Sequence, residues 1–130
     1  MSEGIANPPP AINLVLVRGT LSGPPRTREL PSGSVVVAYD VTVPRPDGER
    51  ADTVPVSWFD PPGAATAMEA GDEICVAGRV SRRFFRQAGG TGSRTDVIAE
   101  AVVPVRRKSQ VRKLLQHVAD TVTAMGEGVT

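Results

Sequence analysis

The chain has 130 residues, of which 40% are hydrophobic but only 4% aromatic, and this fits a single domain with a core of Val, Ala, Leu and Ile. Its single cysteine, Cys75, excludes an internal disulfide and a thiolate metal site, and its single histidine, His117, excludes a site with several histidine ligands. No run approaches the roughly eighteen apolar residues of a membrane span. The first ten residues lack the basic and apolar regions of a secretion signal, so we expect a cytoplasmic protein.

The charges are segregated along the chain although the net charge is only +1. Residues 40–73 contain eight acids and two arginines, whereas residues 79–94 contain five arginines and no acid. A basic strip of this kind is typical of a protein that binds a polyanion. A solvated, charged hairpin fits the charge pattern equally well. The strip consists of Arg79, Arg82, Arg83, Arg86 and Arg94.

The first half of the chain predicts three strands after an N-terminal arm. Residues 1–11 include three consecutive prolines and are expected to form a flexible arm. Residues 13–21 are rich in Val and Leu and predict a first strand with apolar side chains on both faces. The glycines and prolines of residues 23–33 predict turns. Residues 35–43 and 52–59 alternate in polarity and predict the second and third strands.

The second half predicts two more strands around one short helix. Residues 64–70 fit a short helix that ends at Gly71. Residues 73–85 and 95–105 predict the fourth and fifth strands, joined by a glycine-rich hairpin tip at residues 89–92. Five strands with one short helix between the third and the fourth is the element order of an OB-fold barrel. We therefore expect an all-β, five-stranded OB-fold domain over residues 12–105.

A C-terminal amphipathic helix is predicted at residues 108–125, preceded by the basic pair Arg106 and Arg107. An isolated helix of this length is marginal in water. Its apolar stripe must therefore be buried against the barrel, against the same helix of a neighbouring subunit, or against another partner. The stripe contains Val111, Leu114, Leu115, Val118, Val122 and Met125.

Several segments resemble, in order and over about residues 12–104, the bacterial and mitochondrial single-stranded DNA-binding proteins. Residues 39–43 and 52–56 resemble the second strand and the T-D-x-I-P-V run of that family. Residues 71–80 resemble its K-G-x-x-V-x-V-x-G-x-L segment, and residues 83–85 and 95–97 its last hairpin. The opening N-x-V-x-L-x-G-x-L…P-x-x-R-x-x-P-x-G pattern is matched by Asn13, Val15, Gly19, Leu21, Pro25, Arg28, Pro31 and Gly33.

The resemblance implies a protein that binds single-stranded DNA with little sequence preference in replication, repair or recombination, associated with the nucleoid. The family has several aromatic residues on which bases stack. Two of these positions, near Asp47 and Thr53, are not aromatic in this sequence, so Phe59 and Phe85 are the stacking candidates that remain. The family's acidic C-terminal tip, which recruits replication and repair proteins, has no counterpart in MGEGVT. We therefore expect no such recruitment.

Strand alternation assigns faces to the few aromatic residues. Phe84 and Phe85 must point to opposite faces, and the resemblance to the family implies that Phe85 lies on the surface and Phe84 in the core. Phe59 shares its face with polar neighbours and is expected outside, where it can stack on a base. Trp58 and Tyr39 alternate in phase with valines and are expected in the core.

The remaining candidate residues are basic or apolar. Arginines on the last hairpin and before the helix are expected to contact phosphates; they are Arg79, Arg82, Arg83, Arg86, Arg94, Arg106 and Arg107. Leu14 and Leu16 place apolar groups on the outer face of the first strand, through which relatives pair. We therefore expect a homo-oligomer, either a dimer or a tetramer.

We expect no catalytic activity, because the sequence offers no nucleophile with a nearby base and no pair of acid and base groups. No metal or cofactor is expected. Two alternatives to single-stranded DNA binding stay open. The barrel could be a protein-interaction module with little remaining affinity for nucleic acid, or the same grooves could bind RNA.

Overall fold

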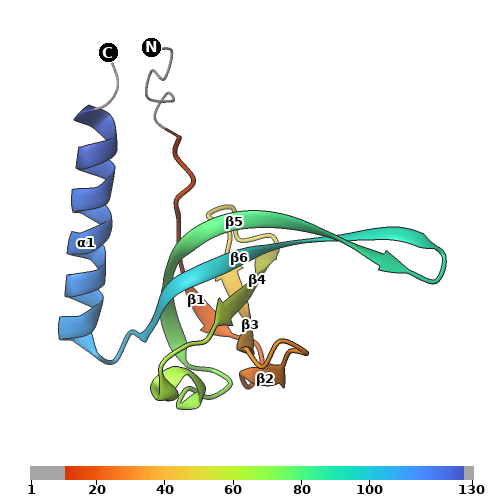
Figure 1. Ribbon diagram of the computed structural model, residues 1–130. Coiled ribbons are helices and arrows are strands. Elements are labelled where there is room, and N and C mark those ends of the chain that lie inside the picture. The colour runs from red at the N-terminus through yellow and green to blue at the C-terminus, as the bar shows by residue number, and fades with distance from the viewer. Residues whose placement is uncertain (1–10, 128–130) are drawn as a thin grey trace, which may run out of the picture.

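The computed structural model describes residues 11–127, so the predicted arm at residues 1–10 and the last three residues lie outside the described part. Strands make up most of it, with one C-terminal helix (Figure 1). The elements are β1 (Val15–Leu21), β2 (Arg26–Glu29), β3 (Val35–Pro44), β4 (Ala51–Phe59), the 3-10 helix η1 (Gly63–Thr66), β5 (Glu73–Gln87), β6 (Gly90–Pro104) and α1 (Lys108–Glu127).

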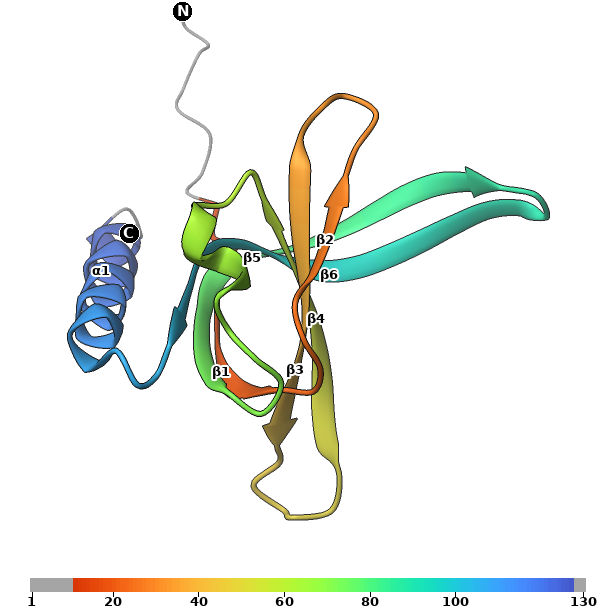
Figure 2. The same ribbon diagram turned by 90° about the horizontal axis from the view of Figure 1, so that it is seen from below.

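The six strands form one sheet that closes on itself. Its order is β1-β5-β6-β4-β3-β2, and the end of β1 pairs again with β3 through Thr20 and Leu21. Five strands therefore pair in a ring, and β2 extends it outside β3 (Figure 2). This is a barrel-like arrangement, and it places alternate residues of each strand inside the ring or on its outer surface.

The interior is filled mainly by valine, as the composition predicts. The largest fully buried side chains belong to Tyr39, Leu21, Ile74 and four valines. Tyr39 is 1% exposed, and its hydroxyl donates a hydrogen bond to the carbonyl of Ala65, 2.7 Å away, which ties η1 to the core. Burial raises the pKa of the Tyr39 hydroxyl. The expected core position of Tyr39 is confirmed, and Trp58 packs against the same cluster while partly exposed.

Two glycines allow strands to approach closely. A Cβ at Gly19 would collide with the carbonyl oxygen of Thr42, where β1 turns back onto β3. A Cβ at Gly78 would collide with the carbonyl of Ile98, next to an irregularity in the β5–β6 register. Such bulges bend a strand and increase its twist. Past the pairing of Val97 and Ile98 with β4, β5 and β6 leave the barrel as a long two-stranded arm, residues 81–96 (Figure 1).

The helix α1 lies on the outside of the barrel, on the side opposite the arm (Figures 1 and 2). Leu114 and Val118 are buried with Cys75 and Ala77 of β5. The thiol of Cys75 is thus covered by α1, and this burial raises its pKa. The chain's own barrel therefore buries part of the apolar stripe of the helix.

The structure departs from the sequence predictions at four places. The strand β6 already begins at Gly90, so most of the predicted hairpin tip at residues 89–92 belongs to the strand. The segment after Pro62 forms only the single 3-10 turn η1, not a helix over residues 64–70. Residues 26–29, predicted as turns, form the edge strand β2. Phe84 is 66% exposed and Phe85 47% exposed, so the expected core position of Phe84 is wrong, because both lie on the arm. Within residues 11–127, α1 is not apolar enough to cross a membrane.

Candidate functional site

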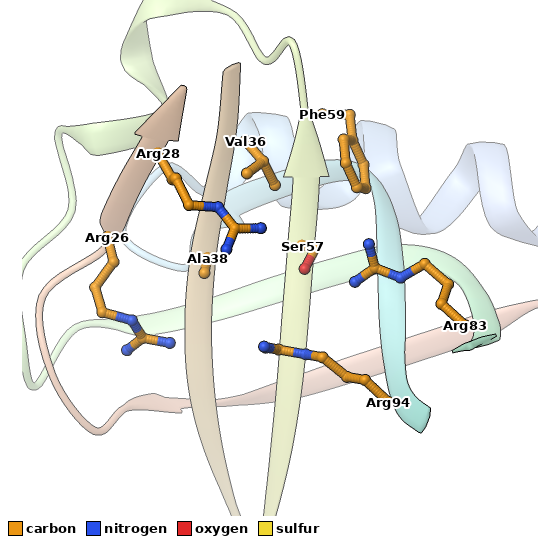
Figure 3. Close-up of a pocket in the computed structure, with 8 residues that line it drawn as sticks. All are labelled: Arg26, Arg28, Val36, Ala38, Ser57, Phe59, Arg83 and Arg94. Atoms are coloured by element: carbon orange, nitrogen blue, oxygen red, sulfur yellow. The ribbon is translucent and has the colours of Figure 1, made fainter. Parts of the chain in front are cut away.

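A pocket lies on the outer face of the sheet and is lined by residues of five strands, β2 to β6. Cross-strand register places Val36 opposite Phe59 and Ala38 opposite Ser57. Their side chains form the floor of a pocket of ≈ 270 Å³, with Arg26 and Arg28 of β2 on one side and Arg83 and Arg94 of the arm on the other (Figure 3). The lining thus combines one aromatic ring, small residues and four guanidinium groups.

The two arm arginines are cross-strand partners, and both point across the floor toward β2 (Figure 3). Arg26 and Arg28 point toward them from the other side, because they are in register with Ala38 and Val36. Guanidinium groups that converge on one concave surface are typical donors to phosphate or carboxylate oxygens. The pocket is therefore shaped and charged for an anion.

A buried carboxylate anchors one side of this pocket. Asp96 is 2% exposed and accepts hydrogen bonds from Ser57 Oγ at 2.6 Å and Arg83 Nη2 at 2.8 Å. Arg94 Nε lies 3.7 Å from the same oxygen. Asp96 Oδ1 and Arg83 Nε are buried without a hydrogen-bond partner among the described residues. Asp96 therefore fixes both arm arginines while lowering the net positive charge around them.

A second ion pair sits at the β2 side, where Arg26 Nη1 lies 2.9 Å from Asp40 Oδ2. Both of these side chains are partly exposed, so the pair is worth little to stability. Three of the four pocket arginines thus have an acidic neighbour in the structure. Guanidinium groups still outnumber carboxylates, and each guanidinium has more donors than its ion pair uses.

The ring of Phe59 lies at the edge of the pocket floor, as predicted from its polar neighbours. The next residue, Asp60, has φ 46°, and its side chain and backbone both bond to the backbone of Val35. This fixes the end of β4 and with it the position of the ring. The guanidinium carbon of Arg83 lies 5.6 Å from the ring centroid. One face of Phe59 is therefore covered by a cation, and a base would stack on the remaining surface or on the guanidinium.

The arm divides the predicted basic strip between two faces. Arg79, Arg83 and Phe85 alternate onto the pocket face, and the ring of Phe85 lies over its cross-strand partner Gly92. The opposite face carries Arg82, Phe84 and Arg86, with the guanidinium of Arg82 over the ring of Phe84 at 5.1 Å. The seven predicted arginines therefore do not form one surface.

The basic residues before α1 lie outside the pocket. Arg106 Nη1 is 3.1 Å from Asp72 Oδ2. The pKa of Asp72 is lowered, first by the backbone N–H of Glu69 and then by Arg106. Arg106 and Arg107 border a different, apolar pocket that is lined by Trp58 and Met68. Arg106 and Arg107, which are expected to contact phosphates, therefore lie apart from the four pocket arginines.

Leu14, which directly precedes β1, and Leu16 on β1 have different surroundings. Leu14 packs against the cluster under α1, whereas Leu16 is 45% exposed. Only Leu16 is therefore available to a neighbouring molecule.

Sequence reasoning missed Arg26, Arg28, Ser57 and Asp96 as site residues. The arginines at 26 and 28 are two positions apart, which on a strand means one face, but residues 26–29 gave no apolar pattern that predicts a strand. Asp96 could not be separated from ordinary surface acids, because its burial comes from Ser57 of another strand and from Arg83 and Arg94.

No protein-family model and no curated protein matches this sequence. Residues 11–127 contain no group of three or more His, Cys, Asp or Glu side chains that could hold a metal ion.

Proposed function

We propose that this protein is an OB-fold protein that binds single-stranded DNA with little sequence preference, without catalysis. The observation that carries the proposal is the pocket on the outer face of the sheet that Arg26, Arg28, Arg83 and Arg94 line together with Phe59. The five-stranded ring with a short helical turn between β4 and β5 supports an OB-fold.

The two interactions that hold single strands are both available on this face. Guanidinium groups neutralise phosphates, and an aromatic face stacks on a base with about 1–3 kcal/mol per base. From the pocket, the same face continues along the arm to Phe85, and Arg79 lies on it at the barrel end of the arm. A strand that crosses the pocket can therefore follow the arm, with bases stacked on Phe59 and Phe85.

Unpaired bases suit this surface better than a duplex. The aromatic ring lies at the floor of a concave pocket, where only a base outside a double helix can reach it. We infer a role in replication, repair or recombination, where single-stranded DNA is exposed.

Fluorescence anisotropy with a labelled oligo-dT of about 20 nucleotides tests the proposal, since an OB fold covers roughly 4–16 nucleotides. Between about 50 and 200 mM salt, the slope of log K against log[salt] should lie near −2 to −3. This corresponds to about three or four phosphates neutralised by the pocket arginines, each of which contributes about −0.7. A duplex of the same sequence should bind more weakly. Binding that is absent at low salt would overturn the proposal and favour the protein-interaction module.

An oligo-U of the same length separates DNA from RNA in the same titration. Equal or tighter binding of the RNA would reassign the pocket to single-stranded RNA. The variant Phe59→Ala should lose about 1–3 kcal/mol of affinity for the preferred strand. Unchanged affinity of a folded Phe59→Ala variant would remove stacking on Phe59 from the mechanism.

A further inference from the structure

The helix α1 carries a second strip, with apolar residues at its centre, that its own barrel leaves exposed. Leu114 and Val118 are 8% exposed, whereas Leu115 is 42% and Val122 50% exposed. The uncovered residues recur at alternating spacings of three and four, which is the pattern of a coiled-coil seam. We call this strip the α1 seam; it consists of Lys108, Arg112, Leu115, Ala119, Val122 and Gly126.

The charges of α1 oppose its own dipole. Its first turn contains no acid and its last turn no base. All its lysines and arginines lie at or before Lys113, and its acids, Asp120 and Glu127, follow. A helix N-terminus favours negative charge and a C-terminus positive charge. This order is unfavourable for a lone helix and favourable beside a second, antiparallel copy, whose acidic end lies next to the basic end.

We propose that the α1 seam is a homodimer interface, in which two copies of α1 pack antiparallel about a two-fold axis near Ala119. In this register Leu115 packs on Val122 of the second copy, and Ala119 meets its own symmetry mate. Small residues at the seam let two helices approach closely. A symmetric pair of this kind buries the same strip of both chains and leaves no part of the seam open for further copies.

Charge complementarity between the two ends of α1 favours a second copy of the chain as the partner at the α1 seam. The same register places Arg112 against Gly126 of the second copy, and the missing side chain leaves room for the arginine stem to reach the adjacent Glu127. Two such pairs form, one at each end of the interface. Within one chain Arg112 and Glu127 are about 22 Å apart along the helix, at 1.5 Å per residue, so they cannot pair with each other.

Charge exchange tests the proposal without DNA. Sedimentation should show the full chain as a dimer, or as a higher even oligomer, at micromolar concentration. Arg112→Glu and Glu127→Arg should each raise the dissociation constant of the dimer at least ten-fold, and the double variant should restore dimerisation. Lys113→Glu, on the opposite side of the helix, is the matched control and should change it little.

Cross-linking tests the register. Ala119→Cys should give a covalent dimer on mild oxidation, whereas Lys113→Cys should not. A protein that is monomeric across the micromolar range would overturn the proposal. An oligomer that is unaffected by the charge changes and does not cross-link at position 119 would also overturn it, and would move the interface to the exposed Leu16 on β1. An Arg112→Glu variant that loses DNA affinity but keeps its oligomeric state would assign the basic end to a polyanion instead.

Discussion

Arg83 is held over the pocket by Asp96, whose buried carboxylate accepts its Nη2 hydrogen bond at 2.8 Å. The same oxygen is approached by Ser57 and Arg94, so one acid links three strand positions of the pocket wall. A binding surface for a flexible polymer gains affinity when its own side chains are already ordered. Asp96 thus lowers the charge of the pocket but reduces the entropy that Arg83 and Arg94 lose on binding.

Replacing Asp96 by Asn should destabilise the fold by about 1.5–3 kcal/mol, the usual worth of a hydrogen bond to a charged group. Asn keeps the size of Asp but removes the charge that attracts two guanidinium groups. Urea unfolding followed by circular dichroism measures the change. The matched control is Asp52→Asn, because Asp52 pairs with Arg45 at 2.9 Å but is 57% exposed, and it should cost less than about 1 kcal/mol. Equal effects at both positions would show that the buried network has no special structural role.

The neighbouring residues Phe84 and Phe85 provide an internal comparison on the arm. Phe85→Ala should weaken binding of single-stranded DNA by about 1–3 kcal/mol, because it removes a stacking face from the pocket side. Phe84→Ala should have a smaller effect, since its ring lies on the opposite face under Arg82. Both variants should fold, because both rings are exposed. A larger loss with Phe84→Ala would place the bound strand on the other face of the arm.

The sequence predicts which residues of a strand share a face, but it does not predict where the strand leaves the barrel. A period of two decides that Phe59 faces out while its neighbour Trp58 packs against the core, and the structure confirms both. The same period shows only that Phe84 and Phe85 point to opposite faces of the strand, and it does not show which of these faces is interior. Whether a face is interior depends on where β5 leaves the ring. The ring ends where β6 stops pairing with β4 at Val97, the cross-strand partner of Val80, and that pairing joins Val97 to Val56, which is far away in the sequence.

The strand β2 is a second element that could not be predicted from its own sequence. Its sequence, RTRE, has no apolar residue, and all four positions are exposed. It is a strand because it pairs with β3, from Arg26 with Ala38 to Glu29 with Val35. Local composition cannot predict an element that is stabilised by its neighbour. For this reason half of the pocket arginines were absent from the sequence-based site.

Acid should destabilise the protein through two exposed ion pairs. The hydrogen bond from Arg18 lowers the pKa of Glu73, and the backbone N–H of Glu69, followed by Arg106, lowers that of Asp72. A carboxyl with a lower pKa in the folded state binds more protons when unfolded, so stability falls as the pH falls through these values. The urea midpoint should therefore decrease from about pH 5 to pH 3, near and below the ordinary carboxyl pKa values of about 4.

The double variant Asp72→Asn with Glu73→Gln should show a shallower decrease over the same range, because its side chains do not titrate. High salt should bring the pH dependence of the urea midpoint of the parent closer to that of the double variant, because salt screens both exposed ion pairs. A variant with the same pH profile as the parent would assign the acid sensitivity to other groups.

Arg28 should contribute to DNA binding through charge alone. It borders the pocket from β2, opposite Phe59, and belongs to none of the sequence-based expectations about phosphate contacts. Arg28→Ala should weaken binding of oligo-dT at low salt and make the slope of log K against log[salt] shallower by about 0.7, the value for one phosphate of a single strand. Arg45→Ala is the matched control, because Arg45 lies beyond the end of β3 and pairs with Asp52. If both variants changed the slope equally, the bound strand would not be confined to the pocket face, whereas a change with Arg28→Ala alone would locate it there.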